Sequence, residues 1–262
     1  MLERRRAQAW QYQPAFRRPR HFHEEPEINL VVRGRGVMSL GDRTISVSAG
    51  SVVWFPPGLD HYLEEASPDF ELFTLGFQSE SVQAYEREHK TVAHFARPPQ
   101  HINAGSTAQF ADVLSEVQSA SDAAAIERRL LRVLHELSLL AQAPGDCLGH
   151  RAASFMLTHP ATSRDQLARA LRSNRGDISR RFHRDHGMTL RQYRNTLRTL
   201  EFLRQLDAGT ANMTRAAIGA GFGSYSQCHR VFHALLGQSP REYLNSQRQE
   251  NPTDRFDPIE LK

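Results

Sequence analysis

The first hundred residues alternate between short apolar runs and turn residues, a pattern typical of β-strands. Four segments carry the clearest β-branched, aromatic or alternating apolar character: Glu27–Arg33, 44–47, 52–55 and 70–77. Between the first two, Gly41 and Asp42 form the kind of dipeptide that closes a tight hairpin. Many short strands separated by Gly and Pro predict a small antiparallel barrel.

Further along the chain, apolar residues recur every three or four positions, as in amphipathic helices. Residues 108–119 and Ala123–Leu140 are expected to be two helices. The second carries a stripe formed by Ile126, Leu130, Val133, Leu137 and Leu140. Its spacing suits a helix–helix seam between two subunits, and it equally suits packing onto the barrel wall.

The C-terminal part contains an internal repeat with a period of fifty residues. Matching positions are Arg180 and Arg230, Phe182 and Phe232, His183 and His233, Gly187 and Gly237, Thr189 and Ser239, and Tyr193 and Tyr243. Each copy is predicted to form helix, turn and helix, with the glycine ending the second helix. Between the copies, Leu190, Tyr193, Leu197, Leu200 and Leu203 predict one long amphipathic helix of about nineteen residues that ends near Gly209.

Capping signals support these helices. Ser163 with Gln166, Thr189 with Gln192, and Ser239 with Glu242 have the spacing of capping boxes, and 224–227 caps a further helix. The turn of the first unit is expected at 173–176. Ile178, Phe182, Cys228 and Phe232 are predicted to lie in the core.

Charge is distributed unevenly along the chain. Residues 151–245 contain 15 Arg and 6 Asp or Glu, a net charge of +9, whereas the rest of the chain has a net charge of −5. The guanidinium group matches phosphate oxygens and the edge of guanine, so a nucleic-acid module is favoured. The alternative is an arginine-rich surface that is only solvated.

Other classes of protein are disfavoured. The sequence has no run of eighteen apolar residues and no apolar segment behind the basic residues 4–6, so neither a membrane span nor a signal peptide is predicted. The two cysteines, Cys147 and Cys228, are too few for a disulfide framework and favour a cytoplasmic location.

Residues 148–245 resemble the AraC-type double helix-turn-helix domain. The residues that carry the resemblance are Arg198, Gly221, Phe222, Ser226, Arg230, Phe232, Gly237, Ser239, Pro240 and Tyr243. Ala216 and Phe202 depart from the usual isoleucine and alanine, which suggests that the two positions repack together.

The resemblance implies that one helix of each unit enters the major groove of double-stranded DNA. The implied DNA-contacting residues are Asn174, Arg175, Ser179, Arg180, Arg184, Ser224, Tyr225, Gln227 and Arg230. Contact with phosphates alone is the alternative for several of them, and Gln227 has the alternative of capping its own helix.

The N-terminal half resembles a cupin. His21, His23, Glu27 and Gly34 give the pattern H-x-H-x3-E-x6-G, and Gly50, Pro56, Gly58 and His61 give G-x5-P-x-G-x2-H. The resemblance implies that His21, His23, Glu27 and His61 converge inside the barrel. Three imidazoles and one carboxylate form a site that suits a divalent Zn, Fe, Mn, Ni or Cu ion. Glu65 stands where asparagine is usual. A metal-free effector pocket and purely structural histidines remain alternatives.

The sequence therefore predicts an α+β protein of two domains. Residues 1–100 are expected to form a cupin-like sensor barrel, 101–147 a helical linker with dimerisation helices, 148–248 the double helix-turn-helix domain and 249–262 a loose polar tail. Whether the arginine-rich segments 4–6 and 17–20 fold over the barrel mouth is left open.

The predicted function is a sequence-specific regulator of transcription, not an enzyme. We expect a homodimer that binds promoter DNA and is controlled by a small-molecule or metal effector in the barrel. A metal-dependent cupin enzyme with a DNA-binding tail is one alternative. A constitutive architectural DNA binder, in which the barrel only dimerises, is another.

Overall fold

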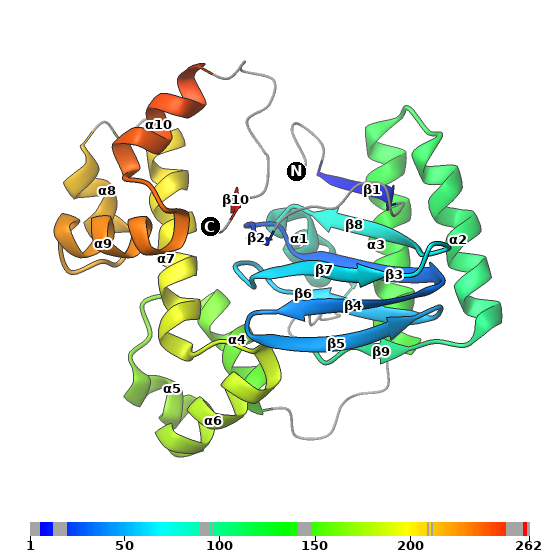
Figure 1. The fold of residues 1–262 in the computed structure, drawn as a ribbon, viewed down its shortest axis with the longest axis horizontal. Coiled ribbons are helices and arrows are strands. Elements are labelled where there is room, and N and C mark those ends of the chain that lie inside the picture. The colour runs from blue at the N-terminus through cyan, green and yellow to red at the C-terminus, as the bar shows by residue number, and fades with distance from the viewer. Residues whose placement is uncertain are drawn as a thin grey trace.

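The computed structural model describes residues 6–12, 20–89, 95, 97–140, 148–208, 210, 212–249 and 259–260. Figure 1 shows an N-terminal part built from strands and three helices beside a C-terminal part built from helices. The predicted α+β class and the two-domain architecture are confirmed. None of the described helices combines the length and apolar character needed to cross a bilayer.

Two five-stranded antiparallel sheets form the N-terminal domain. The first has the order β1 (Ala7–Tyr12), β8 (Glu71–Phe77), β3 (Glu27–Arg33), β6 (Ser51–Phe55), β9 (Gln100–His101). The second has the order β10 (Ile259–Glu260), β2 (His21–Phe22), β7 (His61–Ala66), β4 (Arg35–Leu40), β5 (Arg43–Ser48). Each sheet has two edge strands, so the expected barrel is not closed by hydrogen bonds.

The predicted hairpin joins β4 and β5 through Gly41 and Asp42. The N-terminal strand β1, which pairs with β8, and the helix α1 (Ser79–His89) had no counterpart among the predictions. The tail also differs from the expectation of a loose segment, since Ile259 and Glu260 pair with β2 as strand β10. Residues 251–258 lie outside the described residues.

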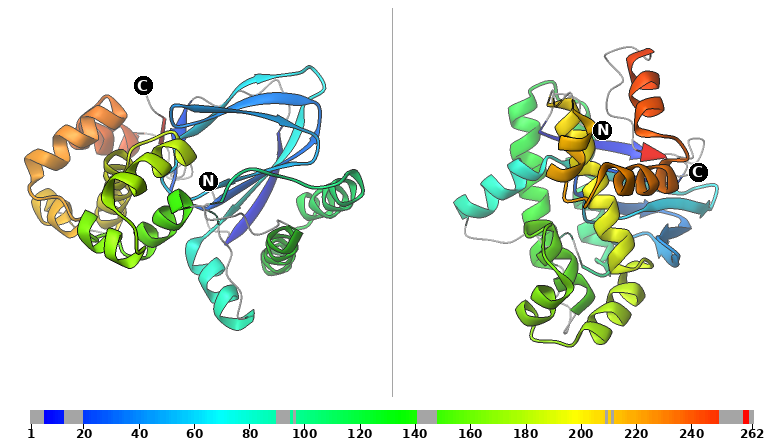
Figure 2. Two further views of the ribbon diagram at one scale, coloured as in Figure 1. Left: turned by 90° about the horizontal axis from the view of Figure 1, so that it is seen from below. Right: turned by 90° about the vertical axis from the view of Figure 1, so that its left-hand side faces the viewer.

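Helices α2 (Ala104–Gln118) and α3 (Ala123–Leu140) cover the outer face of the first sheet (Figure 2). Side chains alternate between the two faces of β3. Ile28 and Leu30 lie in one apolar cluster with residues of α2 and α3, whereas Glu27 and Asn29 line the interior between the sheets. Four residues of the predicted seam are buried in the same cluster: Ile126, Leu130, Val133 and Leu137. The stripe therefore packs onto the chain's own sheet, which is the second of the two possibilities that its spacing allows, and Leu140 is its one exposed member, at 48%.

Seven helices follow in the described C-terminal part. They are α4 (Leu148–Thr158), α5 (Arg164–Ala170), α6 (Arg175–His186), α7 (Leu190–Asp207), α8 (Met213–Gly219), α9 (Tyr225–Leu236) and α10 (Pro240–Gln249). The three predicted capping boxes are present, and Gly187 and Gly237 cap their helices in the left-handed conformation. The turn before α6 is shorter than expected, because Asn174 caps a helix that already includes Arg175.

The repeat produces two similar units at the two ends of α7, which is visible in Figure 1. At 1.5 Å per residue, the 18 residues of α7 span roughly 27 Å. The predicted core residues Ile178, Phe182, Cys228 and Phe232 are all buried. Phe202 and Ala216 belong to one buried cluster, as their joint departure from the usual residues suggests.

The sheet domain and the first helix-turn-helix unit share one apolar cluster. Val53, Phe55 and Leu72 of the sheets belong to it together with Ile178 and Phe182 of α6. At its edge the β4–β5 turn meets the end of α6, where the amide of Asp42 donates a hydrogen bond to the carbonyl of Gly187 at 2.7 Å. The backbones approach so closely that a Cβ atom added to Gly41 or Gly187 would overlap the other turn.

Candidate functional site

A cavity of about 260 Å³ lies between the two sheets. Most of its wall is apolar or aromatic, and its polar groups are concentrated in histidine, glutamate and asparagine side chains. The lining residues come from β2 and from six other strands, β1, β3, β4, β6, β7 and β8. They are Trp10, Gln11, Tyr12, His21, Glu27, Asn29, Met38, Phe55, His61, Tyr62, Leu63, Leu72 and Thr74. Such a combination of apolar walls with a few convergent polar groups is typical of small-molecule sites.

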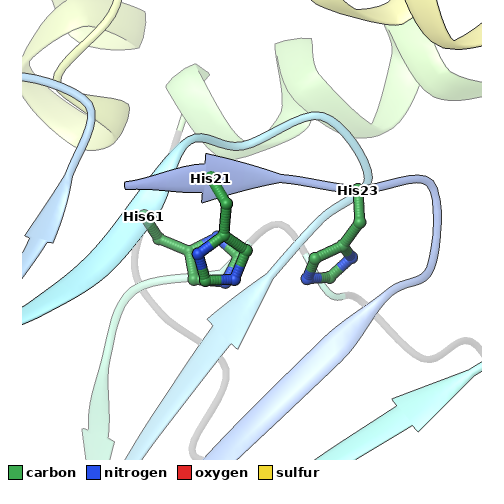
Figure 3. Close-up of side chains that lie close together, drawn as sticks. All are labelled: His21, His23 and His61. Atoms are coloured by element: carbon green, nitrogen blue, oxygen red, sulfur yellow. The ribbon is translucent and has the colours of Figure 1, made fainter. Parts of the chain in front are cut away.

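The three predicted histidine ligands come together, and two of them, His21 and His61, line this cavity. Potential ligand nitrogens of His21, His23 and His61 all lie within 4.8 Å of one another, and the three residues are buried. His21 pairs with His61 across strands β2 and β7. In Figure 3 the three rings lie on the same side of β2. The predicted fourth ligand, Glu27, is only 2% exposed and stands beside them on β3.

Backbone carbonyls fix the orientation of two of the rings. Nδ1 of His23 lies 2.8 Å from the carbonyl oxygen of Glu25, and Nδ1 of His61 lies 2.8 Å from that of Leu59. Because a carbonyl only accepts, both Nδ1 atoms carry the proton and donate it. Both Nε2 atoms are thereby left for the centre of the cluster, an arrangement that protein metal sites use to orient histidine ligands.

Glu27 faces both of these Nε2 atoms. One carboxylate oxygen lies 3.1 Å from Nε2 of His23, and the other lies 3.6 Å from Nε2 of His61. Within the described part of the chain, Nε2 of His61 is buried without a hydrogen-bond partner. A carboxylate and an unprotonated Nε2 are both acceptors, so a proton or a cation must lie between them to make their approach favourable.

Electrostatics support the ionised form of Glu27. Burial alone would raise its pKa, but the adjacent imidazoles of His23 and His61 outweigh that effect and hold the pKa well below the usual range. For His23, burial acts to lower the pKa, and the hydrogen bond and charge of Glu27, with the charge of Glu25, raise it overall. The cluster is therefore a buried anionic group surrounded by imidazoles.

Most wall residues were missing from the predicted site, and three of them carry polar or aromatic side chains of interest. Trp10 and Tyr12 line the cavity from β1, and Asn29 lines it from β3 with an Oδ1 that is buried and has no partner among the described residues. The signal for Asn29 was available, since it lies two positions after Glu27 on one strand and so faces the same side. For β1 the only signal was the weak alternation of 7–12.

The predicted DNA-contacting residues of the first unit extend along α6, from its N-cap Asn174 to Arg184 in its last turn. Asn174 caps this helix by accepting from the amide of Asp177, so its side chain has a structural role. Arg175 pairs with Asp165, and Arg184 pairs with Asp185 at 2.8 Å. Arg180 is the most accessible of these arginines, with a side chain 80% exposed and only a 3.4 Å contact to Asp177. Ser179 is half-buried beside it.

The second unit presents an equivalent set at the beginning of α9. Ser224 caps the helix by accepting from the amide of Gln227, and the side-chain oxygen of Gln227 accepts from the amide of Gly223 at 2.8 Å. The alternative of a capping role for Gln227 is therefore present in the structure. Tyr225 is half-buried, with its hydroxyl 3.3 Å from the sulfur of Met213, while Arg230 is exposed.

Family comparisons match both halves of the chain. Residues 6–134 match the AraC-like ligand binding domain, and residues 167–246 match a helix-turn-helix domain. A curated relative, the uncharacterized protein SCO3923 of Streptomyces coelicolor, is 34% identical over 59 residues, which are 22% of this chain and 56% of that protein.

Solved structures show similarity at low identity. ToxT from Vibrio cholerae is 11% identical, with 91% of this chain and 97% of that chain covered and a TM-score of 0.46. The AraC-like transcriptional activator CuxR is 14% identical, with 76% and 72% covered and a TM-score of 0.35. Because the two family matches together cover most of the chain and fall on its two structural domains, the chain belongs to the AraC-type transcriptional regulators.

Proposed function

We propose that the protein acts in the cytoplasm as a sequence-specific regulator that binds promoter DNA through α6 and α9 and responds to a small molecule in the cavity between its sheets. The observation that carries the sensor part is the cavity itself, whose apolar wall ends in a buried cluster of three histidines and Glu27. The helix-turn-helix match and the exposed arginines of α6 support the DNA-binding part.

At the DNA interface, we assign different roles to the predicted residues. Arg180 and Arg230 are exposed and suit contact with base edges or phosphates. Asn174 and Ser224 cap their helices, so their contribution is to place the first turns of α6 and α9. Arg175, Ser179, Arg184, Tyr225 and Gln227 complete the proposed surface.

In the cavity, we propose that His21, His23, His61 and Glu27 hold a divalent transition metal. Imidazole nitrogens and a carboxylate suit Zn, Fe, Mn, Ni or Cu, and the orphaned Nε2 of His61 facing Glu27 fits a bound cation. A metal ion there would supply a Lewis-acidic anchor for an oxygen- or nitrogen-bearing effector. The apolar wall formed by residues such as Trp10 and Leu72 would enclose the rest of that molecule.

Metal analysis of purified full-length protein tests the metal site. We expect about one equivalent of metal after growth with each candidate ion in turn, and loss of it in the double variant His21→Ala with His61→Ala. His101→Ala changes an exposed histidine outside the cavity and is the matched control. Wild-type protein that contains no metal under any of these conditions contradicts the metal site and leaves a metal-free effector pocket.

Regulation is tested by genome-wide mapping of where the protein binds, with and without candidate effectors. We expect discrete promoter sites whose occupancy changes with one class of small molecule. Uniform occupancy that follows no sequence would contradict sequence-specific regulation and favour an architectural DNA binder.

A second function is favoured by the cluster itself, because three imidazoles and a carboxylate are also the equipment of metal-dependent cupin enzymes. An oxygen-consumption assay on metal-loaded protein with candidate small molecules separates the two functions. Turnover that is lost in the His21→Ala, His61→Ala variant would support the enzyme.

Dimerisation stays a prediction. The stripe expected to form the seam is buried in the sheet domain, so a dimer would need another surface. Light scattering of the full chain over a range of concentrations measures its mass directly.

A further inference from the structure

Strand β2 has different surroundings on its two faces. His21 and, just beyond the strand, His23 face the histidine cluster of the cavity. Phe22 lies between them, and alternation along an extended segment turns its side chain the opposite way. It is completely buried, yet it belongs to a different apolar cluster from the sheet residues around it.

That cluster is the core of the second helix-turn-helix unit. Every other member comes from α7, α8, α9 and the segments next to them, among them Phe202, Phe222 and Phe232. Among the residues that the structure describes, Phe22 is thus the one buried residue of the sheet domain that belongs to the core of the unit that carries α9. A second, smaller cavity of about 190 Å³ adjoins it and is lined by Phe22 and by residues from both domains, including Leu235 of α9 and Gln192 of α7.

The segment that carries His61 also contacts the DNA-binding domain. The carbonyl of Pro57 accepts a hydrogen bond from the hydroxyl of Tyr193 at 3.0 Å, and a Cβ atom at Gly58 would lie 3.0 Å from the side chain of Leu197. Arg20, directly before β2, pairs with Asp60, directly before His61, so the two histidine-bearing segments are tied together.

We propose that Phe22 couples the cavity to the second DNA-reading unit. A ligand bound at the histidine cluster changes the position of β2, and Phe22, which packs against α7–α9, then shifts these helices. The effector end of this coupling rests on the proposed function of the cavity. Phe22 is a positioning residue, because it touches neither the cavity contents nor DNA. The physical basis is that β2 is only two residues long, so its inward and outward side chains cannot move independently.

The coupling is measured on the full chain with Zn²⁺ as the probe and a DNA duplex selected from a random pool by the wild-type protein. In the wild type, we expect Zn²⁺ to change the DNA dissociation constant by about fivefold or more, the range typical of coupled sites. In Phe22→Ala the change should fall below about twofold, while the Zn²⁺ affinity measured without DNA stays near the wild-type value. Phe22→Leu keeps an apolar side chain in the same place and should restore most of the coupling.

Hydrogen exchange of the amides in α8 and α9 supplies a second measurement that needs no metal. Glu27→Gln alters the cluster without touching the helical domain, and it should change this exchange in the wild-type background but not in the Phe22→Ala background. Circular dichroism and thermal melting establish that each variant is folded. Phe22→Val, which keeps an apolar but much shorter side chain, replaces Phe22→Ala in the cycle if the latter does not fold.

The outcomes separate the coupling from the proposed function. Zn²⁺ binding with no effect on DNA affinity in the wild type, or an effect that persists unchanged in Phe22→Ala, overturns the coupling and leaves the metal site standing. Failure to bind Zn²⁺ excludes zinc as the metal, and the exchange cycle then decides on the coupling. An effect of Glu27→Gln that is absent, or independent of Phe22, overturns the coupling.

Discussion

The hydroxyl of Tyr193, in the helix that joins the two DNA-reading units, donates a hydrogen bond to the carbonyl of Pro57, in the loop that leads to His61. Tyr193 is only 1% exposed, and burial raises the pKa of its hydroxyl well above the usual range. The hydroxyl therefore stays protonated and remains a donor across the domain boundary.

Replacing Tyr193 with Phe should lower the free energy of unfolding by about 1–2 kcal/mol, because the ring packing is kept while a buried carbonyl loses its donor. Urea unfolding of the full chain measures the change. Tyr225→Phe is the matched control, since its hydroxyl contacts only a thioether sulfur within the second unit, a weak acceptor. Equal losses in the two variants would contradict an interdomain role for the Tyr193 hydroxyl.

Acid should destabilise the protein through a buried histidine pair. The rings of His150 and His186 lie 4.6 Å apart between α4 and α6. Burial lowers the pKa of His150 from 6.5 to about 4 and that of His186 from 6.5 to about 3. Below about pH 6.5 the two histidines bind protons in the unfolded chain but stay neutral in the folded chain. This contribution to stability is therefore present above about pH 6.5 and is lost as the pH falls toward 4 and 3.

Each unit of pKa shift corresponds to about 1.4 kcal/mol, so the lowered pKa of His150 alone accounts for a loss of a few kcal/mol over this range. Unfolding free energies of the wild type and His150→Gln, measured from pH 7 to pH 4, check the prediction. The variant should show the shallower dependence on pH. Parallel curves would show that His150 does not contribute.

Arg180→Ala should weaken binding to the selected DNA site by about 1–3 kcal/mol and relax the preference at one base pair. The reason is that an arginine guanidinium can donate two hydrogen bonds to the major-groove edge of guanine, which the other bases do not match. The exposed position of this side chain, with one weak contact to Asp177, makes it available for such pairing. Binding titrations against the selected duplex and single-base variants of it measure both effects. A uniform loss on every duplex would make Arg180 a phosphate contact.

Gln227→Glu separates the two roles of this side chain. The substituted carboxylate still offers an oxygen to the amide of Gly223, so the cap and the melting temperature should be retained. If the side chain also faces DNA, the new negative charge should weaken DNA binding by about tenfold, a cost of about 1.4 kcal/mol. Unchanged DNA affinity would leave Gln227 as a cap only.

Much of this arrangement is predictable from local sequence. The repeat, the capping boxes and the glycine stops are short-range signals, and the structure contains all of them where they were expected. The cluster of His21, His23 and His61 is predictable as well, because strand alternation and two short motifs bring the residues together. The helix signals depend on neighbours a few positions away, whereas the approach of His61 to His21 was predicted from the resemblance to a cupin.

The features that were missed depend on partners far away in the chain. The spacing of Ile126 and Leu130 suits a seam between subunits and a contact with a sheet equally well, and only the position of β1 decides between them. Strand β1 itself has a weak pattern. Phe22 stands between two histidines, and nothing near it indicates that its partners are almost two hundred residues further on.

The apolar cluster shared by the sheets and the first helix-turn-helix unit has a practical consequence for anyone who cuts the chain in two. An excised C-terminal fragment would expose the part of this cluster that α4–α7 contribute, and a fragment limited to the sheets would expose the part that the strands contribute. Both fragments should aggregate more readily than the intact polypeptide, and calorimetry of the latter should record a single cooperative transition.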